Sequence, residues 1–210
     1  MSRSLAVQKN YEKDVTLRQW ITVFGSISCS FLAVLNYQIT NSSIREIQGA
    51  LSATLTEASW ITTAYVASSV VVMPLIGWFI RIFSLRTYTL WTLSLFLVVQ
   101  TACGFSSDLN SMISLRFLSG FFGGALIPLS MYILLVTLPV SRRPLAFMLW
   151  GFAVAQAPVV GPVAGGWLTD QFSWHLVFFI QLVPGAIVVL LLLYGLEKSV
   201  RQLELLKSVN

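Results

Sequence analysis

Charged side chains are scarce in this chain of 210 residues. Aspartate, glutamate, lysine and arginine make up 10% of it, whereas soluble domains carry about 25%. Histidine occurs once, at His175, and cysteine twice, at Cys29 and Cys103, without the spacing of a zinc site or a disulfide framework. We therefore expect no metal and no cofactor. With 56% apolar residues and a mean hydropathy of +0.80, the composition excludes a soluble enzyme and indicates an integral membrane protein.

Six apolar segments follow one another with short polar breaks, and each has the roughly 20 residues that one bilayer crossing needs. They cover residues 20–41, 58–80, 87–106, 112–137, 145–168 and 175–196. The sequence therefore predicts an all-α membrane protein, a bundle of six transmembrane helices over 20–196, flanked by polar tails at 1–19 and 197–210. Because the second half of the first segment is polar, a span that ends near Leu35 is the alternative there.

The basic residues lie almost entirely on one side of the expected membrane. If the amino terminus is inside, all of the 13 lysines and arginines except Arg45 and Arg116 fall in cytoplasmic segments or tails. Short loops rich in lysine and arginine stay in the cytoplasm. We therefore expect both termini on the cytoplasmic side of an inner or plasma membrane. This placement explains the net charge of +5 through the membrane, and we expect no nucleic acid as a partner.

Arg116 is the one charge that falls inside an expected span, a few residues from its outer end. An arginine in the hydrocarbon region costs several kcal/mol unless it faces polar partners or water, so such residues mark functional sites. One interpretation is that Arg116 faces the bundle interior. The other is that its long side chain reaches the outer headgroups.

Small residues mark two of the expected helices. Gly120, Gly123 and Gly124 lie at a spacing that predicts close packing against a neighbouring helix. The fifth segment concentrates Pro158, Gly161, Pro162, Gly165 and Gly166 within a few turns. Prolines and glycines are tolerated in a membrane helix when its neighbours satisfy the released backbone groups. This run indicates either a bending helix or plain close packing.

These motifs resemble those of the major facilitator superfamily. Residues 161–166 are similar to its antiporter motif on the fifth helix, and residues 115–125 to its motif on the fourth. Residues 58–65 and 166–185 resemble the multidrug efflux branch, drug:proton antiporters with fourteen spans. The resemblance implies one half of the major facilitator fold, which exports small amphipathic or drug-like compounds by alternating access.

A transporter of this kind also needs residues along a substrate path, which the polar and aromatic side chains of the expected spans supply. Such a mixture favours a lipophilic substrate with a few hydrogen-bonding groups. The residues assigned to the path are Asn36, Gln38, Asn41, Trp60, Tyr65, Arg116 and Gln156. Each of the polar ones can equally serve to bond helices together. The partners expected are a small lipophilic substrate, the lipid bilayer and a second six-span half.

The chain departs from the resembled pattern in three respects. Asn36 stands where the branch often has an aspartate, and the six spans contain no central acid for proton coupling. In the loop after the second span, Arg81 and Ser84 replace an acid and a glycine. The chain also supplies only one half, which leaves open a homodimer, a fragment of a longer protein and a split transporter. A truncated partner that regulates a full-length carrier without transporting is the alternative function.

Overall fold

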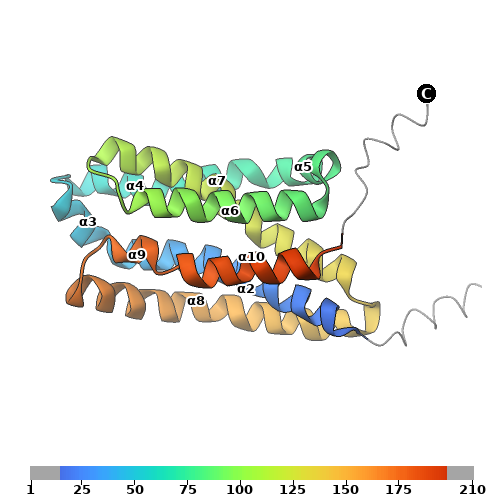
Figure 1. Cartoon of the computed structure of the whole chain (residues 1–210). Helices are drawn as coiled ribbons and strands as arrows, with labels where there is room; N and C mark the ends of the chain where they lie inside the picture. The colour runs from blue at the N-terminus through green and yellow to red at the C-terminus, as the bar shows by residue number, and fades with distance from the viewer. Residues whose placement is uncertain (1–14, 198–210) are drawn as a thin grey trace, which may run out of the picture.

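The computed structural model describes residues 15–197, which fold into one bundle of helices (Figure 1). No strand occurs among these residues, so the prediction of an all-α protein is confirmed. Most of the two expected tails, residues 1–14 and 198–210, lies outside the described part of the chain. The helices follow in the order α2 (Leu17–Ser42), α3 (Ile44–Ala50), α4 (Leu55–Val72), η1 (Met73–Leu75), α5 (Ile76–Phe83), α6 (Leu85–Cys103), α7 (Leu109–Thr137), η2 (Val140–Arg142), α8 (Arg143–Gln171), α9 (Leu176–Phe179) and α10 (Leu182–Gly195).

Five helical segments of the described chain are long and apolar enough to cross a membrane. They are Leu17–Ser42, Leu55–Phe83, Leu109–Thr137, Val140–Gln171 and Leu176–Gly195. The third expected span, 87–106, corresponds to α6, which is not among these five; it has 19 residues but is less apolar because it contains Arg86, Gln100 and several threonines. The structure therefore supports a bundle of apolar membrane helices without confirming that six of them cross.

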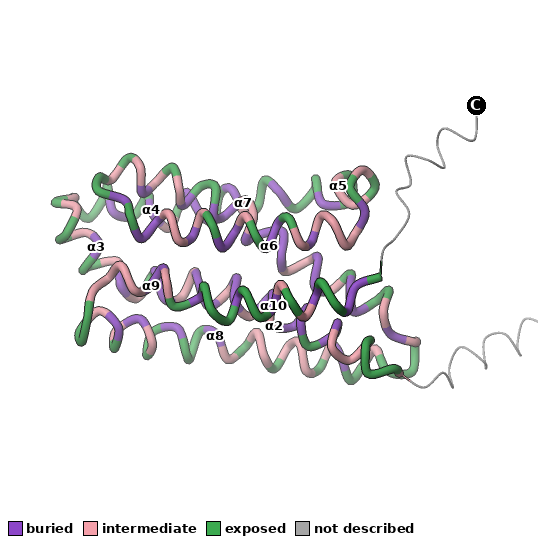
Figure 2. The backbone as a smooth tube through the Cα atoms, viewed as in Figure 1, coloured by how far each residue is buried: buried purple, intermediate pink, exposed green. Residues whose placement is uncertain are grey.

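Two helices lie at the centre of the bundle. In α2 and α7, 56% and 50% of the most apolar stretch is buried, against 17% in the segments that contain α4 and α8. The helix α2 packs against α7, α8 and α10, whereas α7 packs against α2, α4 and α6. Figure 2 shows exposed positions recurring along α10, where large apolar side chains face outward as they do in lipid.

Polar side chains define where three of the long helices begin. Thr16 and Thr54 each accept a hydrogen bond from the backbone N–H three residues later. The side-chain oxygens of Gln19 and Glu57 in turn accept one from the backbone N–H of Thr16 and of Thr54, which completes a capping box at each helix start. Asp108 caps α7 by accepting from the Ser111 N–H at 2.9 Å, which holds the pKa of this exposed carboxyl below its usual value. The helices accordingly begin about one turn before the expected apolar segments.

The long helices are continuous through the positions where breaks were considered. The helix α2 runs on to Ser42 and does not stop near Leu35, where the alternative placed the end of the first span. The helix α8 extends without interruption through Pro158 and Pro162. The last expected segment differs, because Ile180 and Gln181 separate α9 from α10.

Ser84 occupies the junction between α5 and α6 with a backbone φ of 68° and ψ of 152°. This region is essentially restricted to glycine, because a Cβ atom clashes with the neighbouring backbone there. Ser84 is the residue that replaces a glycine of the resembled loop pattern. The turn therefore keeps the backbone shape for which that glycine is suited.

Glycines set the closest helix contacts. A Cβ atom on Gly120 would clash with the backbone oxygen of Tyr65, and one on Gly124 with the backbone of Ser69, so α7 and α4 pack backbone to backbone. Gly123 lies in the same interface, against the Tyr65 hydroxyl and Phe96. The prediction of a small-residue packing stripe on α7 agrees with this geometry.

The glycines of α8 divide into two kinds. A Cβ atom on Gly165 would lie 2.9 Å from the carbonyl oxygen of Ile39 on α2, and one on Gly161 would clash with Gln38. A Cβ atom on Gly166 would meet nothing within 4 Å. Pro158 and Pro162 are exposed on the outer face. Within this motif, Gly161 and Gly165 therefore hold α8 against α2.

We expect Gly165→Ala to lower the free energy of unfolding by about 1–3 kcal/mol, because the added methyl group pushes α8 away from the α2 backbone. Gly166→Ala is the matched control, since its methyl group enters open space and removes a flexible residue from a helix, which raises stability by up to about 1 kcal/mol. Unfolding of the purified variants in mixed micelles measures both effects. Equal destabilisation by the two substitutions would contradict this packing.

Candidate functional site

Arg116 lies inside the bundle, two turns after the start of α7. Its side chain is 0% exposed, the largest fully buried side chain of the described residues. The guanidinium group therefore faces the interior and does not reach the surface, in agreement with the first interpretation of this residue. In the hydrocarbon region such a group must be satisfied by its protein surroundings.

Neutral side chains from three other elements gather around this cation. The Nη1 atom of Arg116 donates to Asn36 Oδ1 on α2 at 2.8 Å and to Gln100 Oε1 on α6 at 3.5 Å. Ser119, one turn further along α7, donates to the same Gln100 oxygen at 3.1 Å. Asn36 in turn donates from Nδ2 to Gln181 Oε1, just before α10, at 3.4 Å. These five buried residues are called the Arg116 cluster below.

Tyr65 on α4 covers one side of the cluster. The guanidinium carbon of Arg116 lies 4.3 Å from the centre of the Tyr65 ring, a cation–π contact. The Tyr65 hydroxyl donates to the carbonyl oxygen of Ala33 at 3.2 Å, and the Tyr37 ring stacks on it with 5.9 Å between centres. Because Gly120 lets the two helix backbones touch, the aromatic ring reaches the charge.

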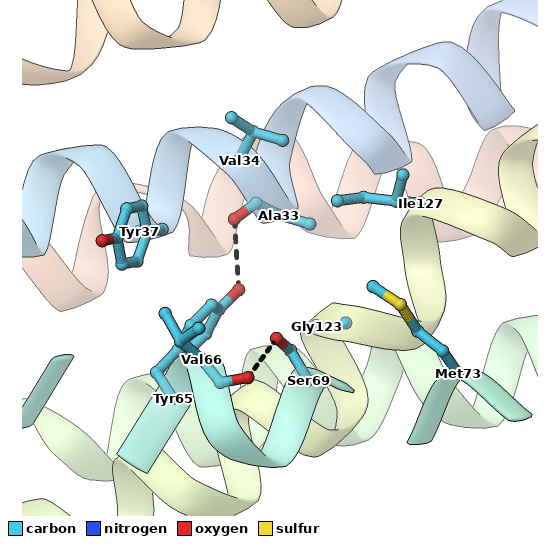
Figure 3. A pocket seen from close by; sticks show the side chains of 10 residues that line it. Ala33, Val34, Tyr37, Tyr65, Val66, Ser69, Met73, Gly123 and Ile127 are labelled. Carbon is cyan, nitrogen blue, oxygen red and sulfur yellow. Dashed lines mark hydrogen bonds between the residues drawn. The ribbon is translucent and has the colours of Figure 1, made fainter. Parts of the chain in front are cut away.

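An apolar groove lies on the other side of Tyr65, between α2, α4 and α7 (Figure 3). Its volume is about 170 Å³. Its walls are mostly aliphatic and aromatic side chains, among them Val34, Tyr37, Tyr65, Val66, Met73 and Ile127. Small-molecule sites usually enclose roughly 300–1,000 Å³, so this groove is smaller than a complete site of that kind.

The structure brings together only part of the expected substrate path. Asn36 and Tyr65 contact Arg116, as described above. Gln38 lies on the opposite side of α2, against Gly161 of α8. Asn41 and Trp60 are exposed, Trp60 to 56%, and Gln156 is half-buried on α8 without a hydrogen bond to the cluster.

Three members of the cluster, Gln100, Ser119 and Gln181, were not among the predicted site residues. Gln100 interrupts the apolar run of α6, and Gln181 interrupts the run from Leu176 onward. An amide within an apolar run is the same kind of signal as Arg116, since burying it requires a hydrogen-bond partner. That signal identifies both glutamines in retrospect, whereas Ser119 has no comparable one.

The part of the sequence that contains this cluster matches a known protein family. The sequence model described as Major Facilitator Superfamily matches residues 27–207, which include the second part of α2, all of the cluster and the glycine motifs of α7 and α8. The chain belongs to the major facilitator superfamily. The motifs at 115–125 and 161–166 thus lie in a chain of the family that they resemble.

Curated superfamily relatives match most of this chain. The chain is 33% identical over 191 residues to the colistin resistance protein EmrB of Acinetobacter baumannii, covering 91% of this chain and 37% of that protein. It is 36% identical over 168 residues to the multidrug export protein EmrB of Escherichia coli K12, covering 80% and 33%. The fatty acid resistance protein FarB of Neisseria gonorrhoeae is 34% identical over 169 residues, covering 80% and 33%. The chain therefore spans about a third of the length of these relatives.

Hydrogen bonds hold the residues of this cluster together around one cation. Asn36, the residue that stands in place of an aspartate, is the closest hydrogen-bond partner of Arg116. The site consequently combines one buried cation with neutral amides and an aromatic ring beside an apolar groove.

Proposed function

We propose that this chain forms the amino-terminal six-helix half of a carrier that exports small amphipathic compounds. The observation that carries the proposal is the Arg116 cluster, a buried polar site beside an apolar groove in a superfamily member. The printed names of two relatives describe multidrug export and resistance to colistin. Those names favour a transporter over a nontransporting regulator.

The proposal includes α6 as the sixth crossing. A helix of 19 residues is about 28 Å long, close to the roughly 30 Å of the hydrocarbon core. The helix lies alongside α7 and α10 within the bundle (Figure 1). Arg86 is in its first turn, where its Nη2 atom donates to the carbonyl oxygen of Leu193 at 2.8 Å. Thr89, Thr92 and Gln100 of α6 are buried inside the bundle.

An even number of crossings is supported by the two ends of the described chain, which meet. Arg18 near the start of α2 forms an ion pair with Glu197, just after α10, at 3.2 Å. The helices α6 and α8 both begin at the same end of the bundle, the right side of Figure 1. Arg86 lies in the first turn of α6, and Arg142 and Arg143 lie at the start of α8. By the charge rule this end is cytoplasmic.

We expect reporter domains fused to Met1 and to Asn210 to lie on the same, cytoplasmic side of the membrane. A reporter inserted after Asp108, in the link between α6 and α7, is expected on the opposite side. In this proposal three crossings, the last of them α6, separate that position from Met1. Protease protection of inside-out and right-side-out vesicles measures all three positions. Termini on opposite faces would contradict six crossings.

Transport by alternating access also needs a second half. The groove is too small to enclose a drug-sized compound, and the halves of such carriers are parallel repeats about an axis along the membrane normal. A second copy of this chain has the required orientation if both termini are cytoplasmic. In this proposal α8 is the helix that changes shape. Pro158 and Pro162 remove backbone hydrogen bonds within it, while Gly161 and Gly165 keep it packed against α2.

We expect liposomes that contain a purified tandem fusion of two copies to release an entrapped amphipathic fluorophore faster than liposomes without protein do. Arg116→Gln in both copies should reduce this flux at least tenfold, because the buried site loses its cation. Arg45→Gln removes an exposed arginine and serves as the control. Flux that is unchanged by Arg116→Gln, or absent from the unaltered fusion, would contradict the proposed function.

A further inference from the structure

We propose that the Arg116 cluster binds the ionised carboxylate of an amphipathic acid, whose apolar chain lies in the groove beyond Tyr65. This inference names the substrate class of the proposed transport site and rests on that proposed function. Binding is nevertheless measurable without transport. Four properties of the cluster support this binding: its charge, its hydrogen bonding, its shape and its position beside the groove.

The first property is the missing counter-charge. A guanidinium group is always protonated in proteins. None of the acidic residues among the described 183 positions from 15 to 197 lies near it, because all five are exposed at the helix ends: Glu46, Glu57, Asp108, Asp170 and Glu197. Arg116 is therefore a buried cation with neutral partners only, and such an uncompensated charge is costly. An anion that enters the site removes this cost.

The second property is an excess of hydrogen-bond donors. Four buried nitrogen atoms of the cluster have no hydrogen-bond partner within the described residues: Arg116 Nε, Arg116 Nη2, Gln100 Nε2 and Gln181 Nε2. All four are donors. The side-chain oxygens of Asn36, Gln100 and Gln181 already accept hydrogen bonds. A ligand that accepts without donating suits these atoms, and an ionised carboxylate does so with about four lone-pair sites.

The third property is the shape of the free edge. Asn36 and Gln100 occupy the Nη1 atom of Arg116, which leaves Nε and Nη2 free. These two nitrogens form one side of the planar guanidinium group, and their N–H bonds point in parallel. Arginine pairs with planar carboxylates through two such parallel hydrogen bonds. The vacant edge matches a carboxylate in shape as well as in charge.

The fourth property is the position of the cluster beside the groove. Tyr65 contacts Arg116 with its ring and also lines the apolar groove, so this side chain separates the two. Side chains from α2, α4 and α6 surround the guanidinium group of Arg116 on α7. In this proposal the Tyr65 ring turns aside to admit a small amphiphile from the groove. Its apolar chain then contacts Val34, Val66 and Ile127.

The test measures the binding of radiolabelled dodecanoate to the full chain in lipid nanodiscs at pH 8.5. We expect saturable binding that unlabelled dodecanoate displaces at least tenfold better than 1-dodecanol or dodecyltrimethylammonium does. Asn36→Asp should weaken binding at least tenfold, because an internal carboxylate then pairs with Arg116. Asn110→Asp, the same change at an exposed position of α7, should leave binding unchanged.

A second variant protects the test against misfolding. If Asn36→Asp does not fold, Gln100→Glu places the internal carboxylate on the other partner of Nη1 and is expected to weaken binding equally. Equal displacement by the three twelve-carbon probes, or full binding by a folded variant with an internal carboxylate, would overturn the proposal. So would an absence of saturable binding. Binding without flux in the tandem fusion would instead refute the transport function alone.

Discussion

One buried positive charge without a carboxylate partner constrains the centre of this bundle. Arg116 is stabilised by the oxygens of Asn36 and Gln100 and by the face of the Tyr65 ring, each from a different helix. Hydrogen bonds to a charged group contribute about 1.5–3 kcal/mol each, so these contacts oppose separation of α2, α4, α6 and α7. The packing of the four helices is in this sense organised around one guanidinium group.

That arrangement depends on glycines as much as on polar groups. The cation–π contact forms only because Gly120 brings the backbones of α7 and α4 together, and Gly124 maintains the contact one turn later. On the other side of α2, Gly161 and Gly165 place α8 against the face that carries Gln38. The inner helix α2 is thus packed tightly on both sides, while its Asn36 side chain faces the charge.

The sequence predicted the helical architecture and the central charge, but only part of the site. Apolar length identified the helices, and a lone arginine in an apolar segment identified Arg116. The path assignment failed to separate Asn36 from Gln38, because residues two apart on a helix point in directions about 200° apart. Polarity alone does not reveal which side of the helix each residue faces. Gln100 and Gln181 were missed because a neutral amide is a weaker signal than a charge, and only the packing shows that Gln100 contacts Arg116 and that Gln181 contacts its partner Asn36.

The central claim is that Arg116 is held by neutral partners and lacks an anion. A double-mutant cycle tests it most directly, through the unfolding free energies of the unaltered chain, Asn36→Asp, Arg116→Gln and the double variant in mixed micelles. The account predicts that Asn36→Asp stabilises the unaltered chain by about 1–3 kcal/mol, because an ion pair replaces a neutral contact. The same change should destabilise the Arg116→Gln variant, in which the carboxylate is buried without a partner. An effect of the same sign and size in both backgrounds would contradict the account.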